Sequence, residues 1–215
     1  MNVDLKTHIT PDLGIDTIVL PDLSKRWDYR FAQFISNAVN PVPVTIMILL
    51  VLAEMTHAWK WAGVYILGAV ALPTLYILWL LHRGVVSDFH IRDREERSNP
   101  MIFTVFTTFL SWLGLKLGGA PIQLTAFAFI GIFLTALLLL ITAFWKISIH
   151  TTAISALSVF LIALFGWQAS FALLMVPLVG WARWRLKAHT LAQIVVGAVV
   201  GFCGHWLALL AQTAN

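Results

Sequence analysis

The last of three polar segments in this apolar chain holds the residues with the clearest potential for chemistry. It contains Arg183, His189 and Gln193 in the pattern Arg-x5-His-x3-Gln. An imidazole can act as a nucleophile or as a general acid or base, and a guanidinium matches two phosphate oxygens at once. A helix that begins near His189 would place Gln193 one turn away on the same face, where its amide oxygen can accept a hydrogen bond from the ring.

The other two polar segments add groups that suit a phosphate. Lys146, Ser148 and His150 supply an amine, a hydroxyl and an imidazole just before a predicted helix, whose free backbone N–H groups favour anions. Arg94 and Arg97 are three residues apart and would share one helical face. These residues predict phosphoryl transfer, in which one histidine attacks, the other protonates the leaving oxygen and the cations stabilise the phosphoryl group. They form no metal-ligand pattern, so we expect neither a metal nor another cofactor.

The composition of the chain predicts that membrane helices position these segments. Hydrophobic residues make up 60% of the 215 residues and charged residues only 11%, far from the balance of a soluble domain. The apolar runs show no strand-like alternation, and the only other structure that spans a bilayer is the helix. The fold class is therefore an all-α polytopic transmembrane bundle of seven spans, or of six if the hairpin at 151–182 does not cross. The predicted spans are 42–59, 61–82, 101–117, 121–144, 151–165, 169–182 and 191–211.

The spacing of the spans predicts that the three polar segments meet. Even numbers of spans separate them, so all three emerge on one face of the membrane. Most lysines and arginines lie on that side, whereas Lys60 and Lys116 lie on the other, and this bias predicts that the site faces the cytoplasm across a cell inner membrane. Residues 1–40 are expected to lie at the membrane surface, and residues 41–215 to form the transmembrane domain. The excess of positive charge then indicates membrane lipids and an anionic substrate as partners, and not nucleic acid.

The three segments resemble the motifs of the phosphatidic acid phosphatase type 2 superfamily, which is related to vanadium haloperoxidases. The third motif of that family is Ser-Arg-x5-His-x3-Asp, and residues 182–193 read Ala-Arg-x5-His-x3-Gln. The second is Pro-Ser-Gly-His, and residues 147–150 read Ile-Ser-Ile-His. The first is Lys-x6-Arg-Pro, for which the nearest match is His-x6-Arg-Ser at residues 90–98. The resemblance covers roughly residues 83–205.

The resemblance implies a metal-independent phosphatase that acts on a lipid or isoprenoid phosphate or diphosphate. His189 would form a phosphohistidine and His150 would be the general acid. The phosphate-binding residues would be Arg94, Arg97, Ser148 and Arg183, and we add Lys146 as a further candidate.

The departures from these motifs leave two other functions open. Gln193 replaces the aspartate that orients and charges the nucleophile, and loss of the analogous charge in a serine triad costs about 10⁴ in rate. The chain could therefore be a catalytically degenerate member that binds lipid or serves as a subunit of a membrane complex. The Asp93-Arg94-x-x-Arg97 loop also suggests a prenyl-transferring enzyme, but the second Asp-rich metal motif that such enzymes generally need is absent from the sequence.

Overall fold

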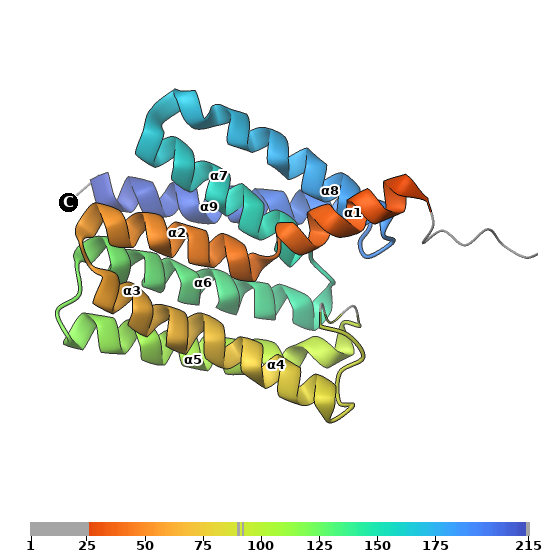
Figure 1. The fold of residues 1–215 in the computed structure, drawn as a ribbon, viewed down its shortest axis with the longest axis horizontal. Coiled ribbons are helices and arrows are strands. Elements are labelled where there is room, and N and C mark those ends of the chain that lie inside the picture. Colours follow the sequence, from red (N-terminus) through yellow and green to blue (C-terminus); the bar gives the residue numbers. More distant parts are fainter. Residues whose placement is uncertain (1–25, 90, 92, 214–215) are drawn as a thin grey trace, which may run out of the picture.

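The described part of the chain is entirely helical. The structure is a computed structural model that describes residues 26–89, 91 and 93–213, and these contain no strand. The helices pack side by side as an elongated bundle (Figure 1). In chain order the elements are α1 (Trp27–Ala38), α2 (Pro41–Thr56), α3 (Trp59–Tyr65), η2 (Ile66–Ala71), α4 (Leu72–His82), η3 (Glu95–Arg97), α5 (Ser98–Leu117), α6 (Ile122–Phe144), α7 (Ile149–Phe165), η4 (Gly166–Leu174), α8 (Met175–Arg185) and α9 (Leu191–Thr213).

Each predicted apolar run falls on helix, and the all-α fold class is confirmed. Four helical stretches are long and apolar enough to cross a membrane, namely Trp59–His82, Glu95–Leu117, Ile122–Phe144 and Ile149–Arg185. A fifth is added if α1 and α2, which meet at 44°, are one broken span. These helices are compatible with an integral membrane protein. Six or seven spans remain a prediction.

The stretch Ile149–Arg185 doubles back on itself, as the hairpin formed by α7 and α8 in Figure 1 shows. The reversal begins at Gly166, whose φ of +71° is a conformation that residues with a Cβ rarely adopt. The 3₁₀ segment η4 then leads into α8. The Ser158 hydroxyl on α7 lies 3.0 Å from the carbonyl of Ala172 in η4 and donates to it across the hairpin.

Small residues let α7 and α9 pack with their backbones close together. The Thr151 hydroxyl donates to the Ile194 carbonyl at 3.1 Å, and the Ser155 hydroxyl donates to the Ala198 carbonyl at 2.8 Å. A Cβ added to Gly201 would overlap the carbonyl of Thr152. This close approach, typical of small residues at membrane helix interfaces, fixes the start of α7 against the start of α9.

The three polar segments lie at one end of the bundle, the right-hand end in Figure 1. Two hydrogen bonds join them there. The Arg97 guanidinium donates from Nη1 to the Ile147 carbonyl at 3.1 Å, and the Ser148 N–H donates to the Gln193 carbonyl at 3.3 Å. Segments that are about fifty residues apart in sequence are therefore in contact, as the spacing of the apolar runs predicted.

The N-terminal segment contributes a helix to the same end. Residues 1–40 were expected to form an interfacial segment, of which 1–25 lie outside the described residues. Helix α1 packs against α8, where Asp28 pairs with Arg185 at 2.9 Å and the rings of Phe31 and Trp181 lie 6.0 Å apart. The segment is thus part of the folded bundle from Trp27 onward.

We expect Gly201→Ala to lower the stability of the protein by about 1–3 kcal/mol, the usual cost of overpacking, because α9 must move away from the Thr152 carbonyl. Gly114→Ala is the matched control, since a Cβ there meets nothing within 4 Å and alanine is the better helix former. Thermal unfolding in detergent measures both. Equal unfolding temperatures for the two variants would contradict the close α7–α9 contact.

Candidate active site

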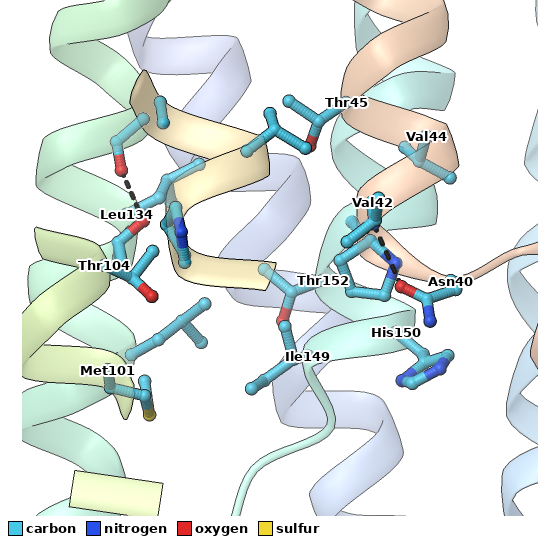
Figure 2. Close-up of a pocket in the computed structure, with 18 of the residues that line it drawn as sticks. Asn40, Val42, Val44, Thr45, Met101, Thr104, Leu134, Ile149, His150 and Thr152 are labelled. Carbon is cyan, nitrogen blue, oxygen red and sulfur yellow. Dashed lines mark hydrogen bonds between the residues drawn. The ribbon is translucent and has the colours of Figure 1, made fainter. Parts of the chain in front are cut away.

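The polar end of the bundle opens into a cavity of about 320 Å³. Four of the predicted site residues line it, namely Arg97, His150, Arg183 and His189. All four side chains are buried. The rest of the lining is mostly apolar and comes from α2, α3, η2, α4, the loop before η3, α5, α6 and α7, and α9 adds the buried His205. Figure 2 shows His150 in the first turn of α7, at the end of the cavity where Asn40 precedes α2.

His189 is held between the end of α8 and the start of α9. After Arg185, Lys187 adopts a left-handed conformation with φ +53°, and the Ala188 N–H donates to the Arg183 carbonyl at 3.0 Å. This closing turn is a common way to end a helix, although glycine usually occupies the left-handed position. His189 follows at once, so the end of α8 fixes where the imidazole begins.

The start of α9 is a capping box, in which Thr190 and Gln193 satisfy each other's backbone N–H groups. The Thr190 N–H donates to Gln193 Oε1 at 3.2 Å, and the Gln193 N–H donates to Thr190 Oγ1 at 3.4 Å. Reciprocal bonds of this kind satisfy two of the N–H groups that every helix start leaves without a partner. The side chain of Gln193 is therefore fixed by the fold itself.

The same Gln193 oxygen sets the tautomer of His189. Gln193 Oε1 lies 3.2 Å from His189 Nδ1 and can only accept a hydrogen bond. Nδ1 therefore carries the proton, and Nε2 keeps the lone pair that a nucleophile needs. The Thr190 N–H, which donates to the same oxygen, supports this orientation of the amide.

The surroundings of His189 keep its ring neutral. Its pKa is lowered to about 3, first by burial and then by the positive charges of Arg183, Arg97 and Lys146, while the bond to Gln193 acts in the opposite direction. Burial and nearby cations both disfavour the charged imidazolium. The ring in the folded protein is therefore neutral across the neutral pH range.

Arg183 is positioned by a residue that the sequence reasoning missed. Its Nη1 donates to the Ser36 hydroxyl of α1 at 2.6 Å, and both side chains are buried. The buried positions of α1 are Ala32, Ile35 and Ser36, which form one helical stripe. A polar residue on the buried stripe of an amphipathic helix was the signal that could have indicated Ser36.

Arg97 joins two of the polar segments while it lines the cavity. Its Nε donates to the Ile91 carbonyl at 2.7 Å and its Nη1 to the Ile147 carbonyl at 3.1 Å. A guanidinium has five N–H donors, so these bonds fix its plane and leave donors for a ligand.

The remaining predicted residues lie around the cavity and do not line it. Ser148 is fully buried as the N-cap of α7 and accepts from the Thr151 N–H at 3.4 Å. Lys146 lies in a shallow depression on the outer side of His189, together with Lys187 and Gln193. Arg94 is exposed and donates to the Ala143 carbonyl at the end of α6, 3.2 Å away. His90, the first position of the weakest motif, lies outside the described residues.

We expect His189 to make stability depend on pH. The unfolded imidazole takes up a proton below its ordinary pKa of about 6.5, whereas the folded one resists protonation down to about 3. Its contribution is therefore complete above pH 6.5 and is lost as the pH falls toward 3, at no more than about 1.4 kcal/mol per pH unit. Thermal unfolding of wild type and of His189→Gln should diverge between about pH 7.5 and about pH 4.5, with the wild type losing more. Parallel curves would contradict a buried neutral ring.

The structure thus gathers the imidazoles of His150 and His189 and the guanidiniums of Arg97 and Arg183 around one cavity, which the buried His205 of α9 also lines. The hydrogen bond to Gln193 leaves Nε2 of His189 with its lone pair. Within the described residues no group of three or more histidine, cysteine, aspartate or glutamate side chains could hold a metal ion. A comparison of the chain with family models, curated proteins and solved structures finds no match.

Proposed function

We propose that this protein is a membrane-embedded phosphatase that removes phosphate from a lipid or isoprenoid phosphate or diphosphate through a phosphohistidine at His189. One observation carries the proposal, which is that a single cavity joins a cationic, imidazole-bearing end to an apolar body. A substrate with an anionic head and a hydrocarbon tail has the same division of chemistry. The order and spacing of the motifs, which resemble those of the phosphatidic acid phosphatase type 2 superfamily, support the same reading.

In the proposed reaction His189 Nε2 attacks phosphorus in line with the leaving oxygen. The N–P bond forms as the P–O bond to the substrate's alcohol or phosphate breaks, and His150 gives its proton to that oxygen. Arg97 and Arg183 stabilise the charge on the transferring phosphoryl group. A water molecule then loses its proton to His150 and attacks phosphorus, which releases inorganic phosphate and returns His189 to its neutral form.

The site face and the membrane belong to the same proposal. The distribution of lysines and arginines supports a cytoplasmic site in a cell inner membrane. In that position a phosphate head enters the polar end from water while the tail stays at membrane depth.

The capping box favours one rival function, a non-catalytic lipid-binding or complex-forming protein of the same fold. Gln193 has a complete structural role at the start of α9 and brings no negative charge to His189. In this rival the cavity holds a lipid phosphate without cleaving it.

We expect His189→Ala to abolish phosphate release from prenyl and lipid phosphates, and EDTA to leave release unchanged. His82→Ala is the matched control, because that histidine is exposed at the end of α4 and does not line the cavity. Labelled phosphate should be trapped on the wild type as an acid-labile adduct and be absent from His189→Ala. If the wild type releases no phosphate from phosphatidate, phosphatidylglycerol phosphate or prenyl diphosphates but still binds them, the rival is correct.

We expect the effect of His150→Ala to depend on the leaving group. An alkoxide needs a proton in order to leave, so release from an alkyl phosphate should fall by about 10²–10⁴, the usual contribution of a general acid. A nitrophenolate leaves without one, so the first phosphoryl transfer from p-nitrophenyl phosphate should fall far less. Single-turnover measurements on both substrates separate the two effects. Equal losses would indicate that His150 has no role as the acid.

A further inference from the structure

The apolar body of the cavity follows the helices as a long, narrow space. On α5 the lining residues run from Arg97 to Thr108, and on α6 they run from Leu138 to Phe127. The first and last residues of each stripe are eleven positions apart, so at a rise of 1.5 Å per residue the cavity extends about 16 Å from its phosphate end, the polar end where Arg97 lies. That is about half of the hydrocarbon thickness of a bilayer, which is about 30 Å.

The wall of this space is apolar even where its residues carry hydroxyl groups. Thr74, Thr104 and Thr135 each donate to the carbonyl four residues earlier in their own helix, at 2.7 Å in every case. Their polar atoms are therefore already satisfied by the backbone. The exception is the buried imidazole of His205 on α9, whose Nδ1 makes no hydrogen bond within the described residues. The rest of the wall suits a hydrocarbon chain.

Two aromatic rings, those of Tyr65 and Phe127, line the far end of the cavity. Tyr65 and Phe127 meet edge to face with their ring centroids 6.0 Å apart. One turn beyond them Leu52, Ala62 and Leu124 are buried in the hydrophobic core. A tail that enters from the phosphate end therefore meets packed protein at the level of these rings.

The volume of the cavity fits one chain. Spread over a length of about 16 Å, 320 Å³ gives a mean cross-section of about 20 Å². That is close to the cross-section of a single extended hydrocarbon chain. Two acyl chains side by side would need twice this area.

We infer that the substrate is a phosphate or diphosphate of one hydrocarbon chain, alkyl or prenyl, and that Tyr65 and Phe127 set the longest tail that the cavity accepts. This inference rests on the proposed function, because the phosphate end fixes where the tail begins. It excludes diacyl lipids as preferred substrates.

We expect the binding affinity to change little with tail length up to a limit and to fall beyond that limit. In a detergent micelle a tail leaves an apolar medium to enter an apolar cavity, so extra methylenes bring little affinity while they fit. A tail that is too long must displace Tyr65 and Phe127, which form the floor of the cavity. Overpacking of that kind corresponds to a loss of about tenfold or more in affinity.

The experiment measures binding of dodecyl-, hexadecyl- and eicosylphosphonate, which cannot be hydrolysed, by calorimetry in detergent. An extended dodecyl chain is slightly shorter than the cavity and a hexadecyl chain is longer. We expect the wild type to bind dodecylphosphonate and to bind the two longer probes about tenfold or more weakly. Phosphate release from the matching alkyl phosphates should show the same limit, and didodecanoyl phosphatidate should be a poor substrate.

Two variants should change the longest tail that the cavity accepts, one by lengthening it and the other by shortening it. Phe127→Ala removes part of the floor and should restore the affinity for hexadecylphosphonate. Phe133→Ala, on the same helix but exposed on the outer surface of the bundle, is the control and should change nothing. Gly131→Leu should exclude even dodecylphosphonate, because a Cβ at Gly131 already lies 2.8 Å from the Tyr65 hydroxyl. Size-exclusion and thermal-unfolding profiles like those of the wild type are required of each variant.

The outcomes separate this inference from the proposed function. If chain-length-dependent binding is found without phosphate release, the tail site stands and the phosphatase fails. If phosphate is released at equal rates from alkyl phosphates of every length and from diacyl phosphatidate, the phosphatase stands and the single-chain limit is wrong. If all three probes bind equally and Phe127→Ala has no effect, the tail does not enter this cavity and the inference is rejected.

Discussion

Burial of two guanidinium groups at the edge of an apolar bundle is the constraint on which this structure depends. A buried charge is costly unless hydrogen bonds satisfy it. The bonds that Arg97 and Arg183 make are also the bonds that hold separate segments together. Arg97 joins the loop before α5 to the segment before α7, and Arg183 joins α8 to Ser36 of α1. The groups that would bind a phosphate are thus the groups that assemble the polar end.

The start of α9 and the orientation of the His189 ring depend similarly on one side chain. Gln193 Oε1 accepts from the Thr190 backbone and lies within hydrogen-bond distance of His189 Nδ1. An error in the start of α9 would therefore also misplace the imidazole. This coupling explains how a loop histidine, with only a few residues between two helices, can keep one orientation and one tautomer.

Much of this arrangement could be predicted from the sequence, because it follows from the number and length of apolar runs. The convergence of three distant polar segments, and the meeting of Arg97, His150, Arg183 and His189, needed only helix spacing and side-chain chemistry. Whether an individual polar side chain lines the cavity or lies at the surface could not be predicted in the same way. Arg94 shares a pattern with Arg97, yet it binds the end of α6 at the surface, because tertiary contacts decide which of two neighbouring cations turns inward.

Two other features, the capping box at the start of α9 and the buried Ser36, do have sequence signals. Thr190-x-x-Gln193 is the sequence signature of a capping box, which gives the glutamine a structural reason. Ser36 lies on the buried stripe of α1, outside the region of motif resemblance. The cavity is different, since it lies where the side chains of several helices leave space between them. A gap of this kind depends on side-chain packing in three dimensions and has no local sequence signal.

The amide at position 193 also determines where the negative charge in the proposed reaction must come from. When His189 attacks, its ring becomes positive, and in a carboxylate-supported site the neighbouring anion offsets that charge. Here the neighbours are Arg97, Arg183 and Lys146, which all disfavour a cationic ring. The phosphate of the substrate is then the anion that compensates both the guanidiniums and the ring. In the proposed reaction the imidazole is neutral near neutral pH before the substrate binds. It would attack effectively only when an anionic head occupies the polar end, so that binding of the head and activation of the histidine would be one event.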